Sequence, residues 1–335
     1  MQAAIYGLAG PAMTEDERAF FRDADPAGYI IFRRNCVDQA QLLALTDELR
    51  DLSGRADVPI LIDQEGGRVA RMRVPDWPAF PAAGAFDRLY RTAPSSALEA
   101  VRSNARALAL MLREAGINVN CLPVLDVRQP GADNIVGDRA LGDEPMQVAA
   151  LGRAVLDGMA SAGVLGTVKH MPGHGRAMVD SHKARPVITA SEEELAIDLE
   201  PFQRLKNAPM GMIAHVVYTA WDAKQPASLS PVVINDIIRG CIGFDGWLIS
   251  DDIGMQALRG AAGQRAAGVV AAGCDVALHC TGTMAEMVSV AASVPAMTRE
   301  AQARLERALA TIAPDDDGPS FAECVDKRDQ LLALA

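Results

Sequence analysis

The sequence predicts an α/β protein built as a single-domain (β/α)8 TIM barrel. Eight short apolar segments alternate with longer amphipathic segments, and polar residues gather at the C-terminal ends of the apolar segments. The length of 335 residues lies within the usual span of such a barrel. Because no linker or shift in composition divides the chain, we expect one domain over 1–335, with a final helical segment at about 297–335 packed on the barrel.

The eight apolar segments are the expected strands. They are continuous rather than alternating, which is typical of parallel strands covered on both faces. Repetition of strand and helix indicates the α/β class. Eight units favour a closed barrel, and an open doubly wound sheet is the alternative. The segments are 4–10, 28–32, 59–66, 117–126, 164–173, 209–217, 246–252 and 275–280.

The segments between the expected strands carry helix signals. The stretches 95–115 and 146–162 each end at a glycine, Gly116 and Gly163, as helices often do. Ser191 and Glu194 have the spacing of a capping box and predict the start of another helix.

Composition excludes several classes of function. The formal net charge is −11, which disfavours nucleic acid as a partner because a basic stripe is the usual footprint of phosphate-backbone binding. No uninterrupted apolar stretch reaches the length of a membrane span. The N-terminus lacks the basic region of a signal peptide, so we expect a cytoplasmic protein. The six scattered cysteines form no CxxC pair and are expected to be reduced thiols.

Polar side chains follow most of the expected strands. In a (β/α)8 barrel the C-terminal ends of the strands form the rim on which active sites are built. Ten polar residues converging on one rim therefore predict a functional site. They are Asp63, Glu65, Arg68, Asp126, Lys169, His170, His215, Asp251, Asp252 and His279.

The loop 169–186 is the segment richest in chemistry, with three histidines in eighteen residues. Asp180 and His182 flank Ser181. A carboxylate this close to an imidazole can accept its N–H, fix its tautomer and raise its pKa. This pair therefore suits general acid/base catalysis near neutral pH. Few large apolar residues anchor the loop, and we expect 173–184 to be mobile.

A metal site is the competing interpretation of the same loop. His170 and His174 are four residues apart, and Asp180 with His182 could complete a tetrahedron. A pair at this spacing binds a metal through helical geometry, which Pro172 between the two histidines breaks. We therefore expect no metal and no organic cofactor.

The segment 243–258 contains the second strong signal, two consecutive carboxylates at the end of a buried strand. Alternation along a strand directs Asp251 and Asp252 to opposite sides. One can face a substrate while the other anchors the backbone or an arginine. A carboxylate at the mouth of an apolar barrel suits attack on an electrophilic sugar carbon.

Four motifs together resemble those of family 3 glycoside hydrolases. They are LIDQEGGRVARM, GDRALG, KHMPGHG followed by DSH, and GFDGWLISDDIGM. Within that family they resemble the bacterial β-N-acetylglucosaminidases of peptidoglycan recycling. The likeness runs from about residue 4 to about residue 285, with the motifs in the family's order. One departure is Met171, where the family usually has phenylalanine.

The resemblance implies a role for each matching residue. Asp251 matches the nucleophile, and His182 matches the acid/base, with Asp180 as its partner. The residues that match the family's substrate-binding positions are Asp63, Arg71, Arg139, Lys169 and His170.

The reaction implied by the resemblance is retaining hydrolysis of a terminal non-reducing β-linked N-acetylglucosamine. The implied substrate is a muropeptide fragment, N-acetylglucosamine on anhydro-N-acetylmuramic acid with or without peptide. We expect a monomer whose partner is this small carbohydrate. Phosphorolysis and a broader β-glycosidase activity are the alternatives within the family. A metal-dependent hydrolase and a non-catalytic sugar-binding protein are the alternatives outside it.

Overall fold

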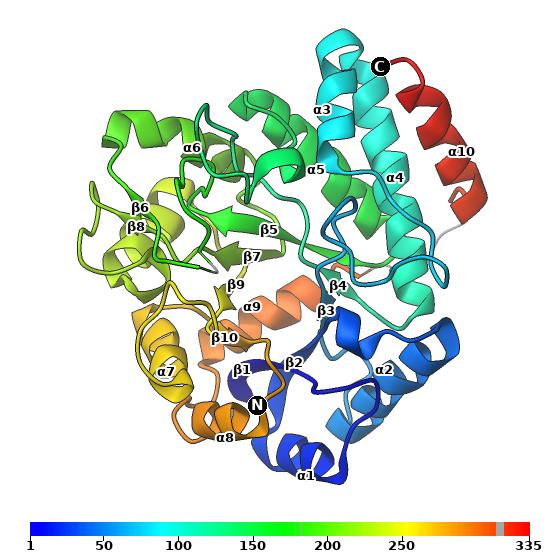
Figure 1. Cartoon of the computed structure of the whole chain (residues 1–335). Helices are drawn as coiled ribbons and strands as arrows, with labels where there is room; N and C mark the ends of the chain where they lie inside the picture. Colours follow the sequence, from blue (N-terminus) through cyan, green and yellow to red (C-terminus); the bar gives the residue numbers. More distant parts are fainter. Residues whose placement is uncertain (182, 313–317) are drawn as a thin grey trace.

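The computed structural model describes residues 1–181, 183–312 and 318–335, and its core is a closed parallel barrel (Figure 1). The strands follow one another around the barrel in the order β1, β10, β9, β7, β5, β4, β3, β2, and β2 pairs again with β1. All eight expected strands are present, which confirms the (β/α)8 barrel. They are β1 Gln2–Gly7, β2 Pro26–Ile31, β3 Ile60–Ile62, β4 Val119–Asn120, β5 Leu165–Met171, β7 Met210–Ile213, β9 Trp247–Asp252 and β10 Val276–His279.

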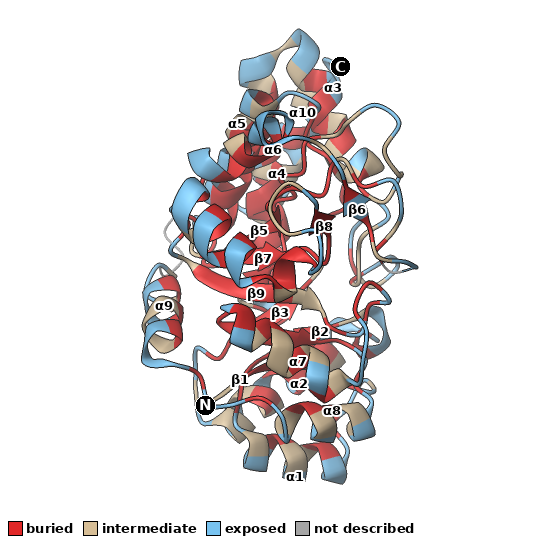
Figure 2. Ribbon diagram, turned by 90° about the vertical axis from the view of Figure 1, so that its left-hand side faces the viewer, coloured by how far each residue is buried: buried red, intermediate tan, exposed pale blue. Residues whose placement is uncertain are grey.

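Helices surround the barrel and bury one face against it, while their outer faces are exposed (Figure 2). The capping box of Ser191 and Glu194 is present, and α4 and α5 each end just before the predicted glycine. The helices are α1 Glu15–Ala24, α2 Gln39–Ser53, α3 Ala83–Thr92, α4 Pro94–Glu114, α5 Pro145–Ala160, α6 Glu192–Arg204, α7 Ala262–Ala272, α8 Met284–Ala291, α9 Arg299–Leu309 and α10 Phe321–Leu332, with a π-helical segment at Val233–Ile242.

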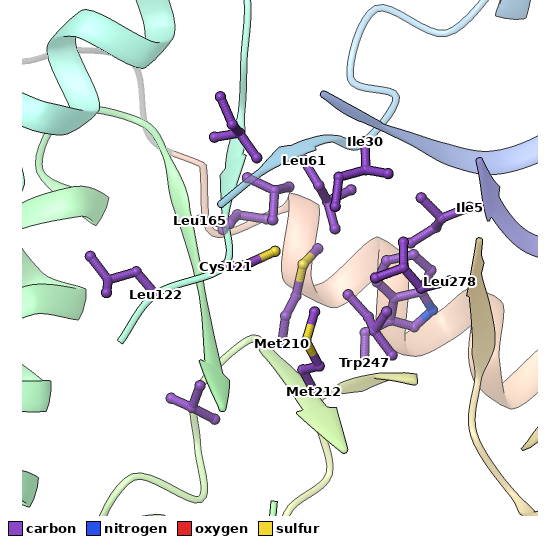
Figure 3. Close-up of a cluster of buried hydrophobic side chains, with 14 of the residues drawn as sticks. Ile5, Ile30, Leu61, Cys121, Leu122, Leu165, Met210, Met212, Trp247 and Leu278 are labelled. Atoms are coloured by element: carbon purple, nitrogen blue, oxygen red, sulfur yellow. The ribbon is translucent and has the colours of Figure 1, made fainter. Parts of the chain in front are cut away.

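The barrel interior is apolar towards the N-terminal ends of the strands and polar at the mouth formed by their C-terminal ends. Buried side chains such as Ile5, Met210 and Trp247 converge from different strands (Figure 3). Successive side chains of a strand point to opposite faces, so the residue two positions after an interior side chain points inward again. Leu61 on β3 is followed in this way by Asp63. The inward-facing positions of one strand therefore change from apolar residues in the core to polar residues at the mouth.

One expected strand is divided in the structure. The apolar segment 209–217 forms β7 and then a separate strand, β8 (Val217–Tyr218). β8 leaves the barrel and pairs in parallel with β6 (Val187–Ile188), which lies beyond the histidine-rich loop. Continuous hydrophobicity did not reveal this break, because both strands are built from apolar residues. The small sheet joins the end of that loop to the segment after β7.

The C-terminal helix packs against the outside of the barrel. α10 lies along α4 (Figure 1), and the guanidinium of Arg328 donates to Asn104 Oδ1 at 3.2 Å. The same guanidinium lies 5.6 Å from the ring centroid of Phe80. That the whole chain is one domain stays a prediction. No helix in the described part of the chain is both long and apolar enough to cross a membrane.

We predict a single cooperative unfolding transition, which Arg328→Ala moves to lower denaturant concentration. The substitution removes a charged hydrogen bond to the buried Asn104, a loss of about 1–3 kcal/mol. Urea unfolding followed by circular dichroism measures it. Lys327→Ala, at an exposed position of the same helix, is the control and should change little. Two separated transitions in the wild type would contradict the single domain.

Candidate active site

A cavity of about 250 Å³ opens at the C-terminal mouth of the barrel. Its walls carry four cationic and four anionic side chains, so their formal charges balance. Six of the residues predicted from the sequence lie in these walls: Asp63, Arg71, Arg139, Lys169, His170 and Asp251. Asp180 is not among the described residues that line the cavity, but its neighbour Ser181 is. His182 lies outside the described residues.

A buried network of charges forms one wall of the cavity. Lys169 Nζ lies 2.9 Å from Asp63 Oδ1 and 2.6 Å from Glu65 Oε1. Arg139 binds both oxygens of Glu65, each at 2.8 Å, and Arg71 donates to Asp63 Oδ2 at 3.1 Å. Side chains of Lys169 and Glu65 are only 2% and 4% exposed. Three cations therefore hold two carboxylates in fixed positions.

This network keeps its members charged. Burial alone would raise the pKa of Glu65, but Arg139 and Lys169 outweigh it and hold that pKa at about 2, below the ordinary 4.5. The pKa of Asp63 is likewise well below its usual range, since Lys169 and Arg71 overcome the effect of burial. Burial alone would lower the pKa of Lys169, but the two carboxylates raise it. Asp63 is thus an ionised hydrogen-bond acceptor facing the cavity.

A tight turn after β3 positions Arg71. Gln64 accepts hydrogen bonds from the backbone N–H groups of Arg71, at 2.7 Å, and Met72, at 3.1 Å. Gln64 itself is held through its backbone by the side chain of Asn120 on β4. Gly66 has φ +100°, and a Cβ there would lie 2.3 Å from the carbonyl oxygen of Pro81. The turn therefore requires glycine, which explains the DQEGG sequence.

His170 is oriented by a buried carboxylate. Asp126 Oδ2 lies 2.7 Å from His170 Nδ1, and Asp126 Oδ1 accepts from the backbone N–H of His170 and of His174. Burial alone would raise the pKa of Asp126, but the two histidines hold it below its usual range. An ionised carboxylate only accepts hydrogen bonds, so Nδ1 of His170 carries a proton.

The two consecutive carboxylates of β9 have different roles. Asp251 borders the cavity, and its Oδ1 also accepts from the backbone N–H of Asp252 at 2.8 Å. Asp252 Oδ1 accepts from the backbone N–H groups of Gly254, at 2.9 Å, and Cys280, at 3.2 Å. Asp252 also borders the cavity, but its bonds anchor the chain after β9 and β10, as alternation predicted for one of the pair.

His215 supports the end of β9 through a hydrogen bond to its backbone. Burial lowers the pKa of His215, so the ring is neutral, with one donor and one acceptor nitrogen. Its Nε2 donates to the carbonyl oxygen of Asp252 at 3.0 Å, and its Nδ1 accepts from Ser228 Oγ at 2.7 Å. The ring thus holds the backbone that presents Asp251.

Phe32 adds an apolar surface to the cavity. Two guanidinium groups lie near its ring, with the Cζ atoms of Arg34 and Arg71 at 5.0 and 5.1 Å from the ring centroid. Such cation–π contacts fix the ring beside the charged wall. An apolar face next to hydrogen-bonding groups is the combination that a sugar ring requires.

The loop after β5 is packed at its start. A Cβ on Gly175 would lie 1.9 Å from the carbonyl oxygen of Val127, so only glycine fits there. His174 is 4% exposed and Ala177 is 1% exposed. Close packing at Gly175 and Ala177 anchors this part of the loop, together with the ion pair of Arg176 with the buried Asp198. Mobility of 173–184 stays a prediction.

No group of three His, Cys, Asp or Glu side chains in the described ranges is arranged to hold a metal ion. His170 of the alternative metal set bonds to Asp126, and His174 Nε2 lies 3.3 Å from Ser181 Oγ. His182, which would complete that set, is outside the described residues.

Sequence reasoning assigned no role to several residues that shape the site. Glu65 and Asp126 were visible as polar strand ends, but their partners are remote in the sequence. Gln64, Asn120 and Phe32 gave no signal, since an amide or an aromatic residue beside a strand is common in any barrel.

Comparisons with known proteins identify relatives of this chain. The sequence matches the model of the glycosyl hydrolase family 3 N-terminal domain over residues 2–313. It is 38% identical over 283 residues to a β-hexosaminidase of Stenotrophomonas maltophilia, covering 82% of each chain. NagZ of Neisseria gonorrhoeae in complex with N-trifluoroacetyl-D-glucosamine superposes with a TM-score of 0.88 at 30% identity, over 99% of this chain and 98% of that one. The same Neisseria protein in complex with a zinc ion gives 0.83 at 29% identity, over 99% and 96%.

The fold and the site thus define a carbohydrate-cleaving enzyme on a (β/α)8 barrel. The chain belongs to glycosyl hydrolase family 3. Its likeness to the β-hexosaminidases confirms the resemblance seen in the motifs and the expectation of a glycoside hydrolase of the β-N-acetylhexosaminidase type.

We predict that Glu65→Gln weakens the dependence of stability on acid pH. The folded-state pKa of Glu65 lies below its ordinary value of 4.5, so its contribution is present above that value and is lost as pH falls towards about 2. Urea unfolding at pH values from about 6 to about 3 measures the slope. Glu15→Gln, at a side chain 90% exposed, is the control. Equal slopes in wild type and Glu65→Gln would contradict the role of this carboxylate.

Proposed function

We propose that this protein is a retaining exo-β-N-acetylglucosaminidase that acts on muropeptide fragments. The observation that carries the proposal is the cavity in which Asp251 lies among ionised Asp63, Lys169 and the oriented His170. The β-hexosaminidase relatives and the N-trifluoroacetyl-D-glucosamine bound to the Neisseria protein support the choice of sugar. The substrate class is N-acetylglucosamine on anhydro-N-acetylmuramic acid, with or without peptide.

The cavity suits a single terminal sugar. Its lower end is the apolar barrel core, and its volume of about 250 Å³ is small beside the ~300–1,000 Å³ of sites for drug-sized ligands. A second sugar must therefore extend out of the mouth. This geometry favours removal of one residue from a non-reducing end.

The substrate-binding groups divide by charge. Asp63 is ionised and accepts hydrogen bonds from sugar hydroxyls, while Lys169, Arg71 and Arg139 donate. Because these groups are already fixed by one another, binding the sugar costs little reorganisation. His170, with its Nδ1 held by Asp126, presents Nε2 to the cavity wall. The ring face packs against Phe32.

The reaction is a double displacement. Asp251 attacks the anomeric carbon and forms a glycosyl ester while His182 donates a proton to the departing oxygen. Asp180 accepts the imidazole N–H and stabilises the charged ring. Water then attacks the anomeric carbon and displaces the carboxylate of Asp251, while His182 takes a proton from the water. Two inversions leave the configuration of the sugar unchanged.

The remaining expectations concern the setting of the enzyme. We propose a cytoplasmic monomer whose only partner is its carbohydrate substrate. Every step uses side chains of the chain itself, so the proposed reaction needs neither a metal nor an organic cofactor. Phosphorolysis, in which phosphate replaces water in the second step, is the alternative reaction of the same site.

We predict that Asp251 carries the covalent intermediate. A slow 5-fluoro-N-acetylglucosaminyl donor should accumulate as an ester on the peptide that contains Ser250, Asp251 and Asp252, detected by mass spectrometry. Asp251→Asn should abolish labelling, because an amide is a poor nucleophile. Asp252→Asn is the matched control and retains the attachment point.

Labelling on Asp252 would instead identify the other carboxylate as the nucleophile. If no adduct forms and a thiazoline mimic inhibits normally, the substrate's own acetamido oxygen is the nucleophile and the mechanism above is wrong.

We predict hydrolysis of aryl β-N-acetylglucosaminide in preference to aryl β-glucoside, with no requirement for phosphate. Product analysis with and without phosphate separates hydrolysis from phosphorolysis, since only the latter yields a sugar phosphate. Dialysis against a chelator should leave the rate unchanged. Loss of turnover that a specific divalent ion restores would favour the metal-dependent alternative.

A further inference from the structure

The turn after β2 is fixed to the segment that follows the neighbouring strand β1. Asn35 in this turn is fully buried, and its Oδ1 accepts from the backbone N–H of Phe32 at 2.8 Å. Its Nδ2 donates to the carbonyl oxygens of Gly10, at 2.7 Å, and Leu8, at 3.3 Å, both in the segment after β1. The backbone that carries Arg34 is therefore held in place independently of the contacts of its own side chain.

The side chain of Arg34 extends from this turn across the end of β1 to the end of β10, the next strand around the barrel (Figure 1). Its Nε donates to the carbonyl oxygen of Leu8 at 2.7 Å, and its Nη2 donates to that of Cys280. Gly7 leaves room for this path, because a Cβ there would lie 2.5 Å from the Cys280 oxygen and 3.0 Å from Arg34 Nη2. One guanidinium thus joins three strand ends, and the rigid fork of its N–H groups fixes their spacing.

Cys280 connects this contact to β9, the strand that carries the proposed nucleophile. The carbonyl of Cys280 accepts from Arg34, and its N–H donates to Asp252 Oδ1 at 3.2 Å. The N–H of Asp252 donates in turn to Asp251 Oδ1 at 2.8 Å. Cys280, Asp252 and Asp251 all border the cavity. A series of hydrogen bonds therefore runs from Arg34 to the carboxylate of Asp251.

The end of β9 is held from both of its neighbouring strands, but in different ways. His215, which follows β7, donates directly to the carbonyl oxygen of Asp252 at 3.0 Å. On the opposite side, the side chain of Asp252 is bonded to the backbone of Cys280, which follows β10. The position of Asp252 therefore depends on that of Cys280, whose carbonyl is bonded to Arg34. Hydrogen bonds from a charged donor are stronger than neutral ones, which suits Arg34 to this task.

We propose that Arg34 is a positioning residue for the nucleophile. By fixing Cys280 beside β1, its guanidinium holds Asp252, and with it the direction from which Asp251 meets the anomeric carbon. Arg34 is not among the described residues that line the cavity, so it acts through the backbone rather than by binding the sugar. This inference rests on the proposed function, because it assigns the contact to the attack of Asp251 in that reaction.

Arg34→Met separates this role from sugar binding. Methionine is similarly unbranched but donates no hydrogen bond. kcat/KM for dinitrophenyl β-N-acetylglucosaminide should fall about tenfold, because a small misplacement of a reacting group slows attack steeply. This substrate leaves without a proton, so its rate reports on the nucleophile rather than on the acid. The inhibition constant of N-acetylglucosamine should change less than about twofold, since ground-state binding of the sugar is retained.

Arg33→Met is the matched control. Arg33 is exposed in the same turn, and its Nη1 donates to the carbonyl oxygen of Cys36 at 2.7 Å, within the turn itself. The substitution should change neither the rate nor the inhibition constant. Arg34→Lys keeps the charge but lacks the fork that bonds to two carbonyls, so its kcat/KM should lie between those of wild type and Arg34→Met. It also keeps the test measurable if methionine destabilises the turn.

A double-mutant cycle tests the route through Asp252. Asp252→Ala removes the acceptor of the Cys280 N–H. If Arg34 acts through this carboxylate, Arg34→Met should lower kcat/KM less than about twofold in the Asp252→Ala background, against about tenfold in the wild type. Thermal unfolding of each variant checks that the fold is intact.

Four results would overturn the positioning role. Comparable losses of kcat/KM and of affinity for N-acetylglucosamine in Arg34→Met would indicate a general structural role, and full activity of this variant would show that the contact is not needed. Full activity of Arg34→Lys would indicate that charge alone matters, and an additive cycle would exclude the route through Asp252. Each leaves the proposed function standing if the wild type is active and labelled on Asp251. A wild type without that activity or label would overturn the proposed function and the positioning role together.

Discussion

The ammonium group of Lys169, held between the carboxylates of Asp63 and Glu65, is the interaction on which the rest of the site depends. Two carboxylates this close would repel each other and could not remain ionised in a buried wall. Lys169 removes that penalty and also joins β5 to β3 across β4. Arg139 and Arg71 also pair with these carboxylates. Every side chain of this wall is therefore charged, but the sum of their charges is close to zero.

The network also explains the shape of the mouth. Arg139 and Arg68 donate to backbone carbonyls of the segment 134–136, with bonds of 2.7–3.0 Å to Ile135. This segment carries the apolar side chains that line the cavity beside the charged wall. Arg139 thus both neutralises Glu65 and holds the segment that lines the cavity beside the charged wall. Arg68 holds the same segment and pairs with Asp138.

Much of this architecture was predictable from the sequence alone. Eight continuous apolar segments and the repetition of strand and helix predict the barrel, because both are patterns of the local sequence. Strand-end polarity predicts the rim, and the motifs resembling those of family 3 glycoside hydrolases single out Asp63, Lys169 and Asp251. The assignment of catalytic roles still rests on that resemblance.

Only the tertiary structure determined which side chains of the site bind one another. Glu65 binds an arginine 74 residues away, and Asp126 orients a histidine 44 residues away, so no local pattern could indicate either pair. The same holds for β8, which leaves the barrel although its residues are as apolar as those of β7. Local periodicity determines where a side chain points along its own strand, but only the closing of the barrel determines what it meets, because the contacts come from strands adjacent in space and remote in the chain.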